Sequence, residues 1–206
     1  MPPPDILLSF FGLAVLLSLT PGPDNLFVLA QSMSSGPRGG LCVVAGLCIG
    51  LVGHTVAVAA GLATLLAGAP AAYTALRLFG AAYLIYLAWG ALRAPTMPLS
   101  GASTLKQTAL LRRGILMNLS NPKVTLFFLA LLPQFTSPLH GSVTLQTLTL
   151  GLVFILATLF VFGAIAALAG YIGDHLRRRP SVQHWLNRLT ATVFCSLALR
   201  LALDPS

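Results

Sequence analysis

The sequence predicts an all-α integral membrane protein of about six transmembrane helices, arranged as two inverted three-helix repeats. Of its 206 residues, 56% are hydrophobic and only 8% are charged, whereas a soluble domain usually carries about 25% charged residues. Two apolar segments, one hundred residues apart, are each interrupted by proline and by a single charge. We therefore expect one membrane transport domain over residues 1–206, with related halves at approximately 5–95 and 105–203.

Apolar runs long enough to cross about 30 Å of hydrocarbon occur about six times in the chain. The first run lacks the preceding basic residues of a cleaved signal sequence, so we expect it to remain as a helix. An odd number of spans in each half means that the second half enters the membrane from the opposite side. The expected spans lie near residues 6–27, 41–67, 70–92, 113–133, 145–172 and 185–203.

The first span is expected to break at Pro21, Gly22 and Pro23, because proline removes a backbone donor and stops a helix. Asp24 and Asn25 follow as residue types that cap a new helix, whose free amide groups attract anions. Asp24 is also the one carboxylate that hydropathy places deep in the chain. A charge at that depth costs about 2.5–3.5 kcal/mol unless it is paired, hydrated or protonated. We therefore expect Asp24 to couple protons to substrate, with a simple helix cap as the alternative.

The fourth span repeats this pattern at Asn121, Pro122 and Lys123. Asparagine is expected at the cap of the next helix and proline in its first turn. Lys123 is the expected counter-charge of Asp24. Paired discontinuous helices point to the substrate site of a transporter. The alternative is that both breaks are ordinary kinks, buried in protein and without a ligand.

The second span carries Gly46, Gly50 and His54, whose spacing of four places them on one helix face. Small residues at this spacing allow helices to approach closely. We expect this face to pack inside the bundle, with a homodimer contact as the alternative. His54, and Tyr83 in the third span, are candidates to line the pathway, although packing within the bundle explains either residue as well.

Basic residues fall in alternate connections between the expected spans. Positive loops remain in the cytoplasm, so both termini are expected outside. The same distribution argues against a nucleic-acid partner, because the charges border membrane spans and form no stripe. The first, third and fifth connections hold Arg38; Arg93, Lys106, Arg112 and Arg113; and Arg177, Arg178, Arg179 and Arg188, respectively.

Three motifs follow one another along the chain: TPGPDN at 20–25, GAAYLIYL at 80–87, and NLSNPK at 118–123 running into FFLALLPQF at 127–135. Together they resemble the lysine exporter and homoserine/threonine resistance family of bacterial amino acid exporters. The resemblance implies an exporter of amino acids or derivatives in the bacterial inner membrane, driven by the proton-motive force, which with the basic loops makes both termini periplasmic. It also places the site at Asp24 and at Asn121, Pro122 and Lys123. We expect a transporter and no enzyme, without a cofactor or metal.

The two arguments together predict how an amino acid would be held. The half-helix amino ends and Lys123 would bind its carboxylate, while Asp24 would bind its ammonium until a proton from outside displaces it. Since the chain has no second deep carboxylate, neutral amino acids are favoured over basic ones.

Two other classes of protein remain open on the sequence. A membrane thiol-disulfide electron carrier needs two facing cysteines, and Cys42, Cys48 and Cys195 do not lie at the breaks. The other is a membrane assembly protein that transports nothing.

Overall fold

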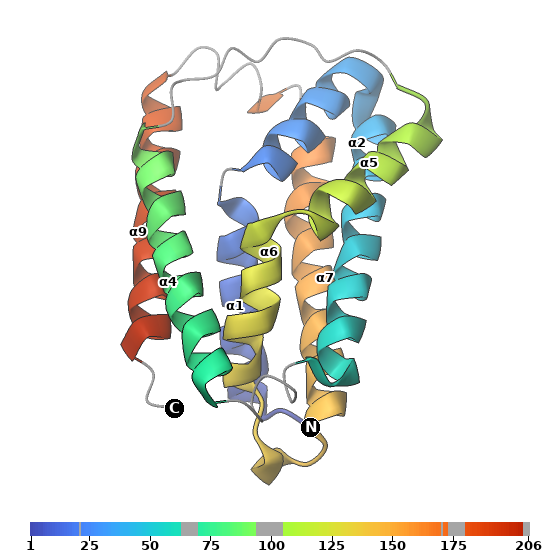
Figure 1. The fold of residues 1–206 in the computed structure, drawn as a ribbon. Coiled ribbons are helices and arrows are strands. Elements are labelled where there is room, and N and C mark those ends of the chain that lie inside the picture. Colours follow the sequence, from blue (N-terminus) through green and yellow to red (C-terminus); the bar gives the residue numbers. More distant parts are fainter. Residues whose placement is uncertain (21, 63–69, 94–104, 170, 173–179, 204–206) are drawn as a thin grey trace.

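The computed structural model describes the chain except for residues 21, 63–69, 94–104, 170, 173–179 and 204–206. The described residues form helices and no strand (Figure 1), which confirms the all-α prediction for this part of the chain. The helices are α1 (Pro4–Leu19), α2 (Pro23–Ala57), η1 (Val58–Leu62), α4 (Pro70–Arg93), α5 (Gln107–Leu119), α6 (Pro122–Leu126), η2 (Phe127–Leu131), η3 (Leu132–Phe135), η4 (Pro138–His140), α7 (Val143–Ala167) and α9 (Pro180–Leu203).

Helix α2 contains a sharp turn at Gly36. This glycine has φ 74° and ψ 175°, a conformation that residues with a Cβ atom rarely adopt, and Pro37 follows it. The chain reverses direction there, at the end of the molecule opposite both termini (Figure 1). The first expected span, 6–27, therefore stops too early, because the helix that starts at Pro23 continues up to this turn.

The helices then alternate in direction along the molecule (Figure 1). Helix α1 and the first part of α2 lead away from the end that carries both termini, and the rest of α2 returns to it. Helix α4 leads away again, α5 and α6 return, α7 leads away and α9 returns.

Several of the described helices are suited to a membrane. Three are long and apolar enough to cross it, and a fourth candidate is the pair Gln107–Leu119 and Pro122–Phe135, which is bent by 48°. Pro4–Leu19 and Leu78–Arg93 are apolar but shorter. A helical protein with several apolar spans is thus confirmed, whereas the number six stays a prediction.

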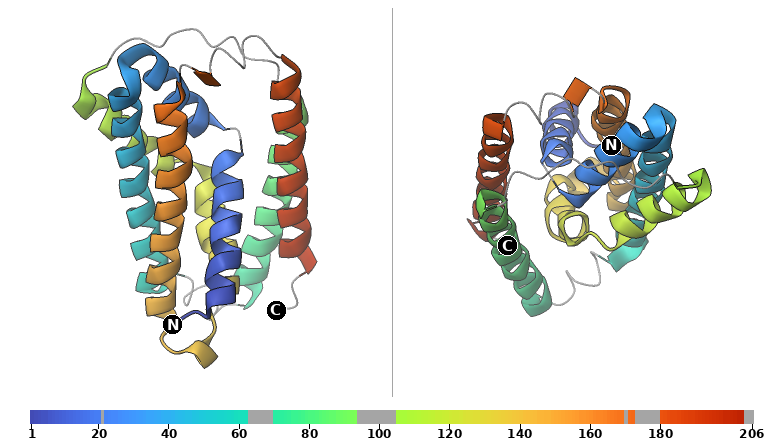
Figure 2. Two further views of the ribbon diagram at one scale, coloured as in Figure 1. Left: turned by 180° about the vertical axis from the view of Figure 1, so that it is seen from behind. Right: turned by 90° about the horizontal axis from the view of Figure 1, so that it is seen from above.

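Packing divides the helices into two groups. Helix α2 packs against α5 and α7, and α1 packs against α7, while α4 pairs with α9. Figure 2 shows the α4–α9 pair on one side of the other helices. The α2–α5 contact is very close, because a Cβ atom on Gly46 would collide with the backbone of Leu111 and one on Gly114 with the carbonyl of Val43. The prediction that the Gly46 face packs inside the bundle is therefore confirmed.

Aromatic side chains fill the core between α1, α7 and the segment after α6. The ring centroid of Phe127 lies 5.6 Å from that of Phe10 and 5.0 Å from that of Phe154. Phe128 lies 5.5 Å from Phe154, and Phe135 lies 5.1 Å from Phe10. We call these five residues the phenylalanine cluster. All are buried, so they form a continuous apolar layer.

Alanine at Gly46 should lower the melting temperature of the purified protein in detergent. The added methyl group would collide with the backbone of α5, and such overpacking typically costs about 1–3 kcal/mol. Gly12→Ala is the matched control, because nothing lies within 4 Å of a Cβ atom there. Equal melting temperatures for the two variants would contradict the close α2–α5 contact.

Candidate functional site

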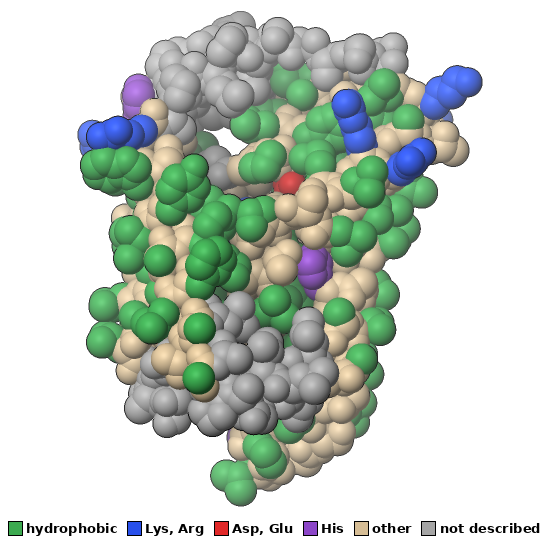
Figure 3. All heavy atoms as spheres, viewed as in Figure 1, with side chains coloured by type: hydrophobic (Ala, Val, Ile, Leu, Met, Phe, Trp, Pro, Cys, Tyr) green, Lys and Arg blue, Asp and Glu red, His purple; other side chains and the backbone are tan. Residues whose placement is uncertain are grey.

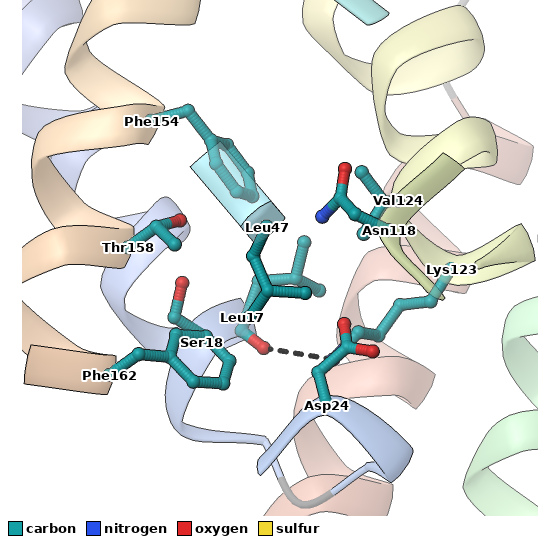
Figure 4. Close-up of a pocket in the computed structure, with 10 residues that line it drawn as sticks. All are labelled: Leu17, Ser18, Asp24, Leu47, Asn118, Lys123, Val124, Phe154, Thr158 and Phe162. Carbon is teal, nitrogen blue, oxygen red and sulfur yellow. Dashed lines mark hydrogen bonds between the residues drawn. The ribbon is translucent and has the colours of Figure 1, made fainter. Parts of the chain in front are cut away.

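A small polar cavity lies where α1, α2, α5, α6 and α7 meet (Figure 4). Its volume is about 20 Å³, enough for about one water molecule. The carboxyl group of Asp24 and the amine of Lys123 both line it, from different halves of the chain. The lining residues are Leu17, Ser18, Asp24, Leu47, Asn118, Lys123, Val124, Phe154, Thr158 and Phe162.

Asp24 lies in the first turn of α2 and is only 4% exposed. Its Oδ2 accepts a hydrogen bond of 2.7 Å from Nδ2 of Asn121, and its Oδ1 has no hydrogen-bond partner in the described part of the chain. The N-cap of α2 is Gly22, and no side chain caps the helix. The alternative for Asp24, a simple helix cap, is thus wrong: its carboxylate instead contacts the second half of the chain.

Asn121 joins the two helix breaks. It is the N-cap of α6, where its Oδ1 accepts a hydrogen bond of 3.0 Å from the backbone N–H of Lys123. Pro122 follows at the start of the helix, where its missing N–H group would have had no partner in the helix. Since Nδ2 of Asn121 donates to Asp24, one side chain both caps α6 and holds the carboxylate of α2.

Lys123 is buried, and its Nζ donates a hydrogen bond of 3.3 Å to the carbonyl oxygen of Leu17. That carbonyl belongs to the last turn of α1, where the helix itself supplies no partner. Among the described residues, the structure records no salt bridge between Lys123 and Asp24. Both charged groups therefore keep hydrogen-bonding capacity toward the cavity that they share.

The other residues predicted at the first break stabilise its backbone. Nδ2 of Asn25 donates a hydrogen bond of 2.7 Å to the carbonyl oxygen of Ser18, in the last turn of α1. A Cβ atom on Gly22 would lie 3.5 Å from Nζ of Lys123, an ordinary contact distance, so the backbone of the break lies directly beside the lysine. Pro23 is the first residue of α2. Pro21 lies outside the described residues.

His54 and Tyr83, the two further candidates, are not among the residues that line the cavity. Nε2 of His54 lies 3.3 Å from the carbonyl oxygen of Asn118, and its ring stacks on Phe128 at 5.5 Å. Tyr83 packs against Tyr86 of the same helix, with ring centroids 5.9 Å apart. His54 therefore caps the last turn of α5, and Tyr83 lies on the α4–α9 side of the molecule.

Sequence reasoning missed three polar residues of the cavity: Ser18, Asn118 and Thr158. All three are at most 4% exposed. Oδ1 of Asn118 has no hydrogen-bond partner among the described residues. The signal for two of them was present, because Ser18 and Asn118 occupy equivalent positions one hundred residues apart, each just before a break.

The three cysteines are free, and none lines the cavity. Cys42 and Cys48 lie on α2 and Cys195 lies on α9. No two of them face each other across the breaks, as a thiol-disulfide electron carrier would require.

Comparison with known proteins places this chain in a family. The model of the LysE type translocator family matches residues 6–205. A homoserine/homoserine lactone efflux protein of Salmonella typhimurium is 35% identical over 195 residues, which cover 92% of each chain. An uncharacterized membrane protein of Vibrio cholerae is 35% identical over 198 residues, which cover 95% of each chain. No solved structure matches the chain.

Asn121→Ala should destabilise the protein more than the loss of a helix cap alone. The variant loses a cap worth about 1 kcal/mol and a hydrogen bond to a buried carboxylate worth about 1.5–3 kcal/mol. Ser142→Ala is the matched control, since its side chain caps α7 through a single bond of 3.4 Å to Leu145. Thermal unfolding in detergent gives the melting temperature of each variant. Equal decreases for Asn121→Ala and Ser142→Ala would show that the bond to Asp24 adds nothing.

Proposed function

We propose, from the fact that this chain belongs to the LysE type translocator family, that it exports amino acids or close derivatives from the cytoplasm. The relative from Salmonella typhimurium, a homoserine/homoserine lactone efflux protein, supports this substrate class. The chain acts as a transporter rather than as an enzyme.

The observation that carries the proposal is that Asp24 and Lys123 line one cavity and both keep unused hydrogen-bonding capacity. Oδ1 of Asp24 has no partner among the described residues, and Lys123 uses one of its three ammonium hydrogens for Leu17. An amino acid carries an ammonium and a carboxylate on one carbon, so it can bind both groups at once. In this arrangement Asp24 holds the ammonium and Lys123 holds the carboxylate.

The same charges favour neutral amino acids. A lysine or arginine substrate would bring a second cation, which is costly to bury without an anion beside it. Asp24 is the one acidic residue in the cavity lining. A homoserine-like side chain needs no such partner.

Proton antiport follows from the burial of Asp24. A carboxylate at this depth is stable when it is neutralised by a bound ammonium or by a proton. Substrate and proton therefore compete for one group, and binding of a proton from outside releases the substrate. Such exchange couples export to the proton gradient.

Transport also requires the cavity to open, since about 20 Å³ is far too small for an amino acid. Inverted repeats provide such a movement by rocking around a central site. The opposite directions of the segments α1–α2 and α5–α6 (Figure 1) support two inverted halves, each with a helix broken beside the cavity. The phenylalanine cluster adjoins the cavity through Phe154.

The charges of the surface support an inner-membrane topology with periplasmic termini. Figure 3 shows that the Lys and Arg side chains of this face gather at the end opposite the termini. Basic ends remain in the cytoplasm. Arg200 is an exception among the described residues, and its guanidinium group stacks on Phe135 at 4.7 Å.

Asp24→Asn should abolish proton-driven export while the protein still inserts into the membrane. The amide has the same shape but can neither neutralise an ammonium nor exchange a proton. The measurement is uptake of labelled homoserine into inside-out vesicles, with and without a proton gradient. Asp5→Asn, which changes an exposed carboxylate at the start of α1, is the control and should transport normally. Undiminished gradient-driven transport by Asp24→Asn would remove Asp24 from the mechanism.

Cysteine labelling should place the two ends of the molecule on opposite sides of the membrane. In a background without the three native cysteines, Leu139→Cys should react with an impermeant thiol reagent added outside the cell. Leu139 is 93% exposed and lies at the end that carries the termini. Arg112→Cys, at the basic end, should react only after the membrane is opened. The reverse pattern would overturn the topology.

A further inference from the structure

Two hydroxyl residues of the cavity are buried, and their hydroxyl groups make no hydrogen bond in the described part of the chain. Ser18 on α1 is 4% exposed and Thr158 on α7 is 3% exposed, and both line the cavity. Figure 4 shows them on the wall across the cavity from Asp24 and Lys123. A hydroxyl that stays unpaired once a ligand covers it is costly, so these two groups favour a ligand that bonds to them.

Several other hydroxyl residues of these helices bond to their own helix, although the hydroxyl of Ser35 on α2 has no partner among the described residues. Ser32, Thr55 and Thr190 each donate to the backbone carbonyl four residues earlier, at 2.7 to 2.8 Å. Such a bond satisfies the hydroxyl within its own helix. Ser18 and Thr158 make no such bond, and their hydroxyls remain available to whatever enters the cavity.

We infer that Ser18 and Thr158 form a hydrogen-bonding subsite that selects substrates by a small polar group on the side chain. This inference rests on the proposed function. With the ammonium and the carboxylate held by Asp24 and Lys123, the side chain extends toward the opposite wall. A hydroxyl both donates and accepts, so the subsite suits a substrate hydroxyl or a compact ester oxygen.

The subsite also rejects apolar substrates of equal size. An apolar side chain would fill the space but leave both hydroxyls unpaired in a closed cavity. A site built to hydrogen-bond its substrate discriminates against an analogue without the polar group much more strongly than an apolar pocket discriminates by size. Ser18 and Thr158 therefore determine specificity rather than supply the main binding charge.

The test compares homoserine with norvaline, which has a methyl group in place of the hydroxyl. Both are supplied, labelled, to the same inside-out vesicles, so differences in protein amount cancel in their ratio. The wild type should prefer homoserine. Thr158→Val, which keeps the shape of the side chain, and Ser18→Ala should each reduce that preference by about tenfold, the size of one hydrogen bond. Thr158→Ser should keep it.

Thr147→Val is the matched control, because Thr147 lies on the same helix, is equally buried at 3% and does not line the cavity. The Thr147→Val variant should prefer homoserine over norvaline as strongly as the wild type does. An unchanged preference in both Thr158→Val and Ser18→Ala would overturn the subsite and leave the export function intact. Equal transport of homoserine and norvaline by the wild type would also overturn the subsite. The same holds if Thr158→Val transports neither compound while Ser18→Ala keeps its preference. A wild type that transports neither compound would overturn the proposed function and the subsite with it.

Discussion

The hydrogen bond between Asn121 and Asp24 is the interaction on which the rest of the site depends. A carboxylate buried among apolar helices needs a partner, and here the partner comes from a residue 97 positions away. The bond can form only because both helices are interrupted at the same depth. It therefore fixes the two breaks beside each other, and Lys123 follows Asn121 by two residues into the same cavity. The position of every charged group in the site follows from this contact.

Each break also leaves carbonyl groups without partners, and side chains from elsewhere satisfy them. Lys123 and Asn25 bond to the end of α1. At the end of α5 the carbonyl of Asn118 accepts from the backbone N–H of Asn121 and also lies beside His54. These contacts explain how a polar interruption survives inside an apolar bundle, where every backbone group must find a partner in protein. The chain is thereby held open at two points without exposing its backbone to lipid.

Much of this arrangement could be predicted from the sequence, because charged residues and prolines are rare in an apolar chain and therefore stand out. Asn121 as a helix cap and Lys123 beside the cavity follow from residue type and spacing. The bond from Asn121 to Asp24 does not, since a pairing between distant segments depends on how the helices pack. Ser18 and Thr158 were missed because serine and threonine usually bond to their own helix, so only the structure shows that these two do not. The turn at Gly36 lies in the connection expected between residues 27 and 41, but the helix that reaches it was missed because residues 31–35 are mostly polar.

The phenylalanine cluster has an electrical consequence for a membrane with a voltage across it. Five buried rings exclude water and ions, so the cluster that they form is an insulator, whereas a cavity that opened to water beside it would be a conductor. On the proposed topology, most of the voltage would then fall across the rings instead of across the full thickness of the bilayer. A charge that passed them would gain nearly the whole electrical energy of the membrane, about 2.3 kcal/mol per 100 mV, in one short step. The rings would thus concentrate the driving force of the proposed export at the edge of the cavity.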